Sequence, residues 1–181
     1  MAEKHSIDDD LKEFIEAQQM FFVGTAPRSD DGLVNISPKG LDGTFQILDP
    51  TTVAYLDLNG SGIETVAHIR ENSRIVFLFC AFDGRPKIVR IHGTAEVVMP
   101  GDARWDTLRA HFPTDLTARS IVLTTCRRVA TACGFGVPLY EYQGQRRNLH
   151  DWADRKGEDG IREYVARKNR LSLDGLPGID P

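Results

Sequence analysis

The residues best suited to bind a ligand lie in a glycine-containing loop between a strand and a helix. The strand Tyr55–Leu58 ends at Asn59-Gly60-Ser61-Gly62, and a helix with Glu64 in its first turn follows. Ser61 and Glu64 have the spacing of a capping box, in which each side chain bonds the other residue's backbone amide. Free amides at a helix N-terminus attract anions, so the loop is a candidate phosphate site. The same residues also fit a capped crossover helix that binds nothing.

Other residue types that could do chemistry do not form a recognisable centre. Lys39 follows Pro38 at the expected end of a strand, where a cation either reaches an adjoining pocket or lies in solvent. Cys133 stands beside a glycine, and no neighbour is placed to activate its thiol. The five histidines are isolated, and no pair has the spacing of metal ligands. The sequence therefore assigns no catalytic residue and no metal site.

The elements that must position these residues are mostly strands. Apolar and β-branched runs predict strands at residues 21–25, 33–37, 45–48, 52–58, 74–82, 87–98 and 120–131. Amphipathic spacing predicts helices at residues 7–19, at 61–72 and from 146 onward with a stop at Gly157. Ser6 is the expected N-cap of the first helix, and Pro38 is expected to close the second strand. This order favours a mainly β fold, an antiparallel barrel with flanking helices.

Composition is that of an ordinary globular protein. The chain has 181 residues, 41% apolar and 27% charged, and its net charge of −4 argues against a general nucleic-acid binder. It contains no apolar run of membrane-spanning length, and its acidic N-terminus is unlike a secretory signal. Three separated cysteines do not form a disulfide framework, which favours a cytoplasmic location. One domain is expected, with its barrel in residues 1–140 and a helical extension and tail in residues 141–181.

The order of three motifs resembles the pyridoxamine 5′-phosphate oxidase-like family of FMN-binding split barrels. These motifs are Val34–Gly40, then Gly60–Thr65 with His68 and Glu71-Asn72, then Arg90–Gly93. The resemblance covers residues 15–135, and the segments 133–138 and 173–177 resemble an uncharacterised branch of the family. It implies a six-stranded antiparallel split barrel that forms a homodimer, with the FMN sites at the subunit interface.

The resemblance also implies how the phosphate of FMN is held. Lys39 would lie near the phosphate, and Ser61, Gly62 and Thr65 would supply hydroxyl and amide donors at the helix N-terminus. Arg90, on a strand that flanks the phosphate in relatives, would be a second cation. The true oxidases carry an Arg-Lys pair after the loop serine, where this chain has Gly62 and an isoleucine. Oxidation of pyridoxamine phosphate is therefore not expected.

The flavin ring is expected to lie against a different part of the chain. The backbone of Asn35, Ile36 and Ser37 would run along the ring edge, where amides tune its electronics. The loop that starts at Cys133 would close the ring pocket from the other subunit. Each of these roles is implied by the resemblance alone.

The sequence thus favours an FMN-dependent oxidoreductase acting on a small organic substrate, with neither a nucleic acid nor a membrane as partner. Two alternatives stay open. One is a reductase that holds a deazaflavin in the same barrel. The other is a flavin- or haem-binding protein without turnover, for which His150 is the candidate haem ligand. The substrate and the electron donor are not determined by the sequence.

Overall fold

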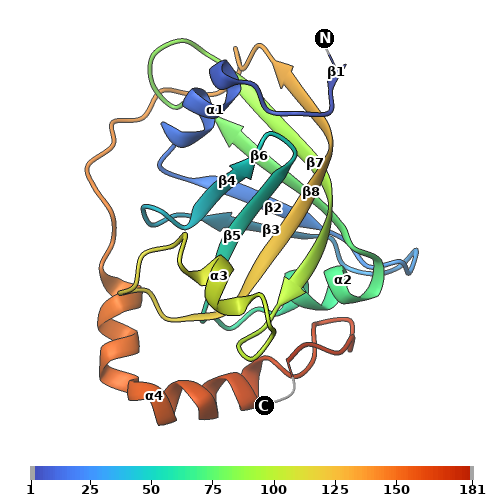
Figure 1. Cartoon of the computed structure of the whole chain (residues 1–181), viewed down its shortest axis with the longest axis vertical. Helices are drawn as coiled ribbons and strands as arrows, with labels where there is room; N and C mark the ends of the chain where they lie inside the picture. Colours follow the sequence, from blue (N-terminus) through green and yellow to red (C-terminus); the bar gives the residue numbers. More distant parts are fainter. Residues whose placement is uncertain (1–2, 180–181) are drawn as a thin grey trace.

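A computed structural model describes residues 3–179, which form one strongly curved antiparallel sheet with helices around it (Figure 1). The strands are β1 (Glu3–Lys4), β2 (Phe21–Thr25), β3 (Asn35–Lys39), β4 (Phe45–Asp49), β5 (Thr52–Leu58), β6 (Arg74–Cys80), β7 (Ile88–Val98) and β8 (Ala118–Ala132). The helices are α1 (Asp9–Glu16), α2 (Glu64–Asn72), α3 (Trp105–Arg109) and α4 (Asn148–Lys168). None of the helices described is long and apolar enough to cross a membrane.

The sheet follows the order β3-β2-β6-β7-β8-β5-β4, and the short β1 pairs with β8. Every pairing is antiparallel. The predicted split barrel with flanking helices is confirmed, but the main path holds seven strands instead of six and is not closed. The long strands β7 and β8 curve through the sheet and bring its two halves face to face (Figure 1). Strands β3 and β4 stand at the two ends of the strand order and are the edges of the sheet.

Aromatic side chains fill the interior of the curved sheet. Phe21 lies with its ring centroid 5.0 Å from Phe45, 5.9 Å from Tyr55 and 5.6 Å from Phe79. Tyr55 is fully buried, and edge-to-face and stacked contacts between rings add to the free energy gained by burying them. Helix α1 packs Leu11 and Ile15 into the same core. The core therefore fixes β2 and β5, which supply part of the cavity floor described below.

Two predicted element boundaries are wrong for identifiable reasons. The N-cap of α1 is Asp8, whose carboxylate accepts a hydrogen bond from Leu11 N at 3.0 Å, and not Ser6. An ionised aspartate there also interacts favourably with the helix dipole. Strand β3 continues through Pro38 to Lys39 because it is an edge strand with one neighbour, where a missing N–H is tolerated. This extension brings Lys39 into register with Phe21.

The C-terminal third of the chain wraps around the sheet. An extended segment leaves β8 and runs along one side of the molecule to α4, which bends at Gly157, where φ is 63° and ψ 174° (Figure 1). The predicted break at Gly157 is thus present as a kink. Residues 169–179, here called the tail segment, turn back through a bridge between Leu171 and Pro177 and lie beneath α2. The predictions that include residues 1, 2, 180 and 181 lie, at those positions, outside the described residues.

Candidate functional site

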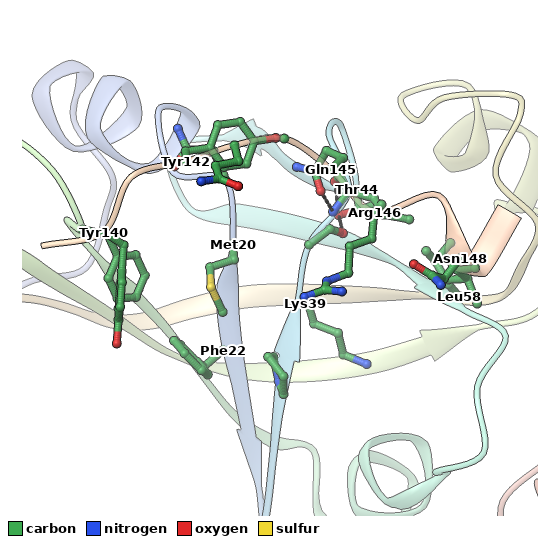
Figure 2. A pocket seen from close by; sticks show the side chains of 18 of the residues that line it. Met20, Phe22, Lys39, Thr44, Leu58, Tyr140, Tyr142, Gln145, Arg146 and Asn148 are labelled. Atoms are coloured by element: carbon green, nitrogen blue, oxygen red, sulfur yellow. Dashed lines mark hydrogen bonds between the residues drawn. The ribbon is translucent and has the colours of Figure 1, made fainter. Parts of the chain in front are cut away.

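A cavity of about 1120 Å³ opens between the sheet and the extended segment that precedes α4 (Figure 2). Its floor comes from β2, β3 and the end of β5, with Phe22, Lys39 and Leu58 among the lining side chains. Its outer wall is the run from Tyr140 to Arg146, here called the strap. A cavity of this volume is slightly larger than most small-molecule sites, which measure about 300–1,000 Å³.

The floor carries a buried charge cluster that includes Lys39. Asp57 is fully buried, and its carboxylate accepts from Arg119 Nε at 2.7 Å and from Ser120 Oγ at 3.1 Å. Lys39 Nζ lies 3.5 Å from the other oxygen of Asp57 and 5.7 Å from the centre of the Tyr55 ring. Burial raises the pKa of Asp57, but Arg119 and Lys39 outweigh it and hold the pKa below the usual 3.8. One carboxylate therefore faces two cations, and Lys39 carries the surplus positive charge into the cavity.

The opposite end of the cavity is aromatic. Tyr140 N donates to the carbonyl oxygen of Phe82 at 2.8 Å, and the two rings lie 5.5 Å apart. Figure 2 shows Tyr140 and Phe22 at one side, and Lys39 and Arg146 at the other. The acidic residues Asp83 and Glu141 also line the cavity and follow Phe82 and Tyr140 directly in the chain. The cavity is thus cationic at one end and aromatic at the other.

The predicted phosphate loop has a different structure from the one expected. Helix α2 begins at Glu64 with Ile63 as its N-cap and no side-chain cap, so the predicted capping box is wrong. The Glu64 carboxylate instead accepts from Leu173 N, in the tail segment, at 3.3 Å. A Cβ placed on Gly62 would lie 2.7 Å from a Glu64 oxygen, so this carboxylate lies directly against the loop. A negative charge at that place disfavours a bound anion.

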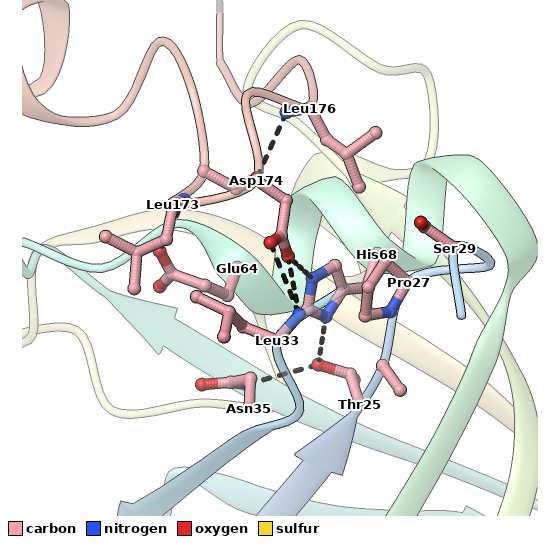
Figure 3. A network of polar contacts seen from close by, with 12 residues as sticks. Thr25, Pro27, Ser29, Leu33, Asn35, Glu64, His68, Leu173, Asp174 and Leu176 are labelled. Carbon is pink, nitrogen blue, oxygen red and sulfur yellow. Dashed lines mark hydrogen bonds and ion pairs between the residues drawn. The ribbon is translucent and has the colours of Figure 1, made fainter. Parts of the chain in front are cut away.

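The polar residues at the start of β3 bind one another (Figure 3). Asn35 Nδ2 donates to Thr65 Oγ1 at 3.0 Å and to Thr25 Oγ1 at 3.1 Å, and its Oδ1 accepts from Ser37 Oγ at 3.1 Å. Thr25 Oγ1 lies 3.0 Å from His68 Nδ1. Since Thr25 and Thr65 are buried, their hydroxyls are committed to this network. The side chain of Asn35 therefore has a fixed orientation.

The tail segment completes this network through Asp174. The Asp174 carboxylate accepts from Leu33 N at 3.1 Å, and one oxygen lies 3.8 Å from His68 Nε2. That distance is too long for a hydrogen bond, and the buried Nε2 has no hydrogen-bond partner among the described residues. Burial lowers the pKa of His68, and the neighbouring Asp174, Glu64 and Glu71 only partly offset this effect. His68 is thus neutral near pH 7 and is covered by the chain's own C-terminus.

Comparison with known proteins identifies the family. The family model described as pyridoxamine 5′-phosphate oxidase matches residues 7–133. The chain is also 36% identical over 192 residues to the pyridoxamine 5′-phosphate oxidase family protein ustO of Aspergillus flavus, a match that covers 96% of this chain and 76% of that protein. The chain belongs to the pyridoxamine 5′-phosphate oxidase family.

Solved structures show the same fold at low sequence identity. HupZ of Group A Streptococcus has a TM-score of 0.54 and 21% identity, covering 75% of this chain and 99% of that one. A pyridoxamine 5′-phosphate oxidase-type protein of Lactobacillus delbrueckii has a TM-score of 0.54 and 19% identity, with coverage of 72% and 99%. An FMN-binding protein of Syntrophomonas wolfei has a TM-score of 0.51 and 15% identity, with coverage of 66% and 82%. These likenesses concern the fold alone.

Within this member of the pyridoxamine 5′-phosphate oxidase family, the predicted site residues separate into three places. Lys39 lines the cavity. The polar residues Asn35, Ser37 and Thr65 form the network beside the tail segment, and the exposed Ser61 and Gly62 lie next to it. The other three, which are Ile36, Arg90 and Cys133, are exposed and are not among the cavity's lining residues. Their roles stay predictions.

The sequence reasoning missed the strap. Arg146 was predicted to begin the last helix and Gln145 was given no role, whereas α4 begins at Asn148 and both residues belong to the cavity wall. The available signal was the pair Tyr140 and Tyr142 in a run without helical periodicity. Exposed aromatic residues that are close in sequence are typical of binding surfaces.

Proposed function

We propose that this chain is an FMN-dependent oxidoreductase that acts on a small organic substrate. The observation that carries the proposal is Lys39, which has surplus positive charge and opens into a cavity of about 1120 Å³ in a chain of the pyridoxamine 5′-phosphate oxidase family. A phosphate ester needs a cation of this kind, and a planar ring needs an apolar or aromatic wall. The cavity offers both at its two ends.

The residues present fit FMN. Lys39 would bind the phosphate group, and Phe22 and Tyr140 would pack against the ring, while the strap excludes water from the ring's outer side. FMN, when bound, supplies the acceptor and donor of electrons. The chain's own part is to bind, to orient and to shield. A conspicuous protein acid or base is therefore not required.

A true pyridoxamine 5′-phosphate oxidase activity is not proposed. The Arg-Lys pair of those enzymes is replaced by Gly62 and Ile63, and the carboxylate of Glu64 lies against the same loop. A phosphate group would be repelled there.

We also propose that the functional unit is a cytoplasmic homodimer with the cofactor sites at its interface. Leu33, Val34 and Ile36 are 53%, 71% and 70% exposed, on or just before the edge strand β3. An apolar stripe on an unpaired sheet edge is typical of an interface. The free cysteines Cys80, Cys126 and Cys133 are compatible with a reducing compartment. Sedimentation analysis that finds only monomers would contradict the dimer.

The enzyme proposal is tested by the reactivity of the loaded chain. The FMN-loaded protein is mixed with NADH or NADPH without oxygen, and oxygen is then admitted while the visible flavin absorbance is followed. Bleaching followed by recovery is the expected result. If dithionite reduces the bound FMN but neither NADH nor NADPH does, the result would favour a flavin carrier without turnover. Haem absorbance in place of flavin absorbance would overturn the proposal.

A further inference from the structure

Two cations from distant parts of the chain project into the same end of the cavity. Lys39 comes from the end of β3, and Arg146 comes from the strap, more than a hundred residues later. Figure 2 shows both side chains directed into the same region. The family resemblance accounts for Lys39 alone. Arg146 is assigned no role by any motif of the sequence.

The charge at this end is only partly neutralised by the protein, because Lys39 shares the single carboxylate of Asp57 with Arg119. The carboxylate of Asp57 is already engaged by Arg119, which donates to one oxygen at 2.7 Å and reaches the other at 3.4 Å. Within residues 3–179, Arg146 forms no ion pair, and the two acidic residues that line the cavity follow the aromatic residues at its other end. Two nearby positive charges repel one another, so an anion between them is favoured.

The strap that carries Arg146 is fastened on both sides of the cavity mouth. At one end, Tyr140 N donates to Phe82 O at 2.8 Å. At the other, the Gln145 amide accepts from Leu41 N at 3.2 Å and donates to Asp42 Oδ1 at 2.8 Å. Gln145, which makes these two hydrogen bonds, directly precedes Arg146. The hydrogen bonds therefore hold the Arg146 backbone over the cavity. The backbone that carries the Arg146 guanidinium is therefore fixed by hydrogen bonds on both sides of the cavity mouth.

We propose that Arg146 and Lys39 together form a phosphate-binding subsite, in which Arg146 replaces the Arg-Lys pair that the loop after Ser61 lacks. The ligand is a phosphate monoester, for which a guanidinium offers paired donors in matching geometry. This inference rests on the proposed function, since FMN is its first candidate occupant. A phosphorylated substrate is the second source of the same chemistry.

The test compares FMN with riboflavin, which has the same ring and no phosphate. Each is titrated into the apoprotein and into Arg146→Gln, and the flavin fluorescence is measured. We expect Arg146→Gln to weaken FMN binding about 10- to 100-fold, the loss typical of one charge-assisted hydrogen bond, and to leave riboflavin binding unchanged. Equal FMN affinity in the two proteins would overturn the subsite.

Arg147→Gln is the matched control. Arg147 is also an exposed arginine, but its Nε lies 3.8 Å from Asp151 and it does not line the cavity. The Arg147→Gln substitution removes the same charge one residue away, and this variant should bind FMN as the unmodified chain does. If Arg147→Gln weakened FMN binding as much as Arg146→Gln, the effect would be one of net charge, and the subsite would be refuted.

Inorganic phosphate separates this inference from the proposed function. If the chain does not bind FMN but phosphate stabilises it against thermal unfolding, and Arg146→Gln removes that stabilisation, the subsite stands and serves a phosphorylated substrate. If FMN binds, and binds Arg146→Gln equally well, the proposed function stands and the subsite fails. If neither FMN nor phosphate binds the unmodified chain, both fail.

Discussion

Both ends of β3 carry polar residues, but their surroundings differ. One end faces a cavity, and the other is hydrogen-bonded within the chain. At the Lys39 end, Lys39 and Arg119 share the one carboxylate of Asp57, and Lys39 lines a large cavity. At the Asn35 end, every amide and hydroxyl group discussed above is bonded within the chain, and Asp174 of the tail segment covers the network. Polar groups that already have partners gain little from a ligand. The comparison therefore supports the proposal that the ligand binds at the Lys39 end.

The largest expected effect comes from Arg119, which joins the two regions. Its guanidinium binds Asp57 on the cavity side and donates to Gly60 O and Asn169 Oδ1 on the tail side, each at 3.0 Å. Arg119→Ala leaves a buried carboxylate short of its main partner and should cost about 3–5 kcal/mol of unfolding free energy. Urea denaturation measures it. Arg104→Ala, which removes an exposed ion pair with Glu96 that solvent screens, should cost far less. Equal losses would show that Arg119 is not a structural centre.

Lys39→Met should weaken FMN binding by about 1.5–3 kcal/mol, because a charge-assisted contact to phosphate is lost. Asp57 keeps Arg119, so the variant should remain folded. Fluorescence titration gives the dissociation constant, with riboflavin as the ligand that should be unaffected. A dissociation constant for FMN equal to that of the unmodified chain would remove Lys39 from the site.

The strands of the sheet could be predicted from the sequence, whereas the different surroundings of the two ends of β3 could not. Strands such as 21–25 and 88–98 are set by local alternation and turn residues, so they are visible in a short window. The cavity depends on Gln145 meeting Leu41, and the covered network depends on Asp174 meeting Leu33, contacts between residues more than a hundred positions apart. Glu64 has the spacing of a capping box, but its carboxylate accepts a hydrogen bond from Leu173 N in the tail segment. Local patterns do not show such partners.

Gly178→Ala should loosen the tail segment and leave the cavity unchanged. A Cβ there would lie 2.2 Å from Asn169 O and 2.7 Å from a side-chain carbon of Ile63, so the tail must shift, at about 1–3 kcal/mol. Gly136→Ala is the control, because no atom lies within 4 Å of its added Cβ. Hydrogen exchange of the Ile179 amide, which donates to Asn169 O at 2.7 Å, reports the loosening. If FMN affinity fell together with tail protection, the two ends would not be independent.

The smallest expected effect is a pH dependence at the covered end. Burial lowers the pKa of His68 below its ordinary 6.5, so on acidification the unfolded chain takes up this proton before the folded chain does. The stability from neutral His68 is therefore complete above about pH 6.5 and is lost as the pH falls toward the folded-state pKa.

Urea denaturation across this pH range should show a shallower loss of stability for His68→Gln than for the unmodified chain. His111→Gln, at an exposed histidine, should keep the original slope. If the two variants behaved alike, the buried imidazole would not be the source of the pH dependence.

The most direct measurement is the absorbance spectrum of the purified chain, with mass spectrometry of the compound that heat releases. The predicted result is a flavin spectrum, with FMN released at one molecule per chain and retained poorly by Lys39→Met. A colourless chain that also fails to bind added FMN would contradict the assignment of the Lys39 end as a cofactor site.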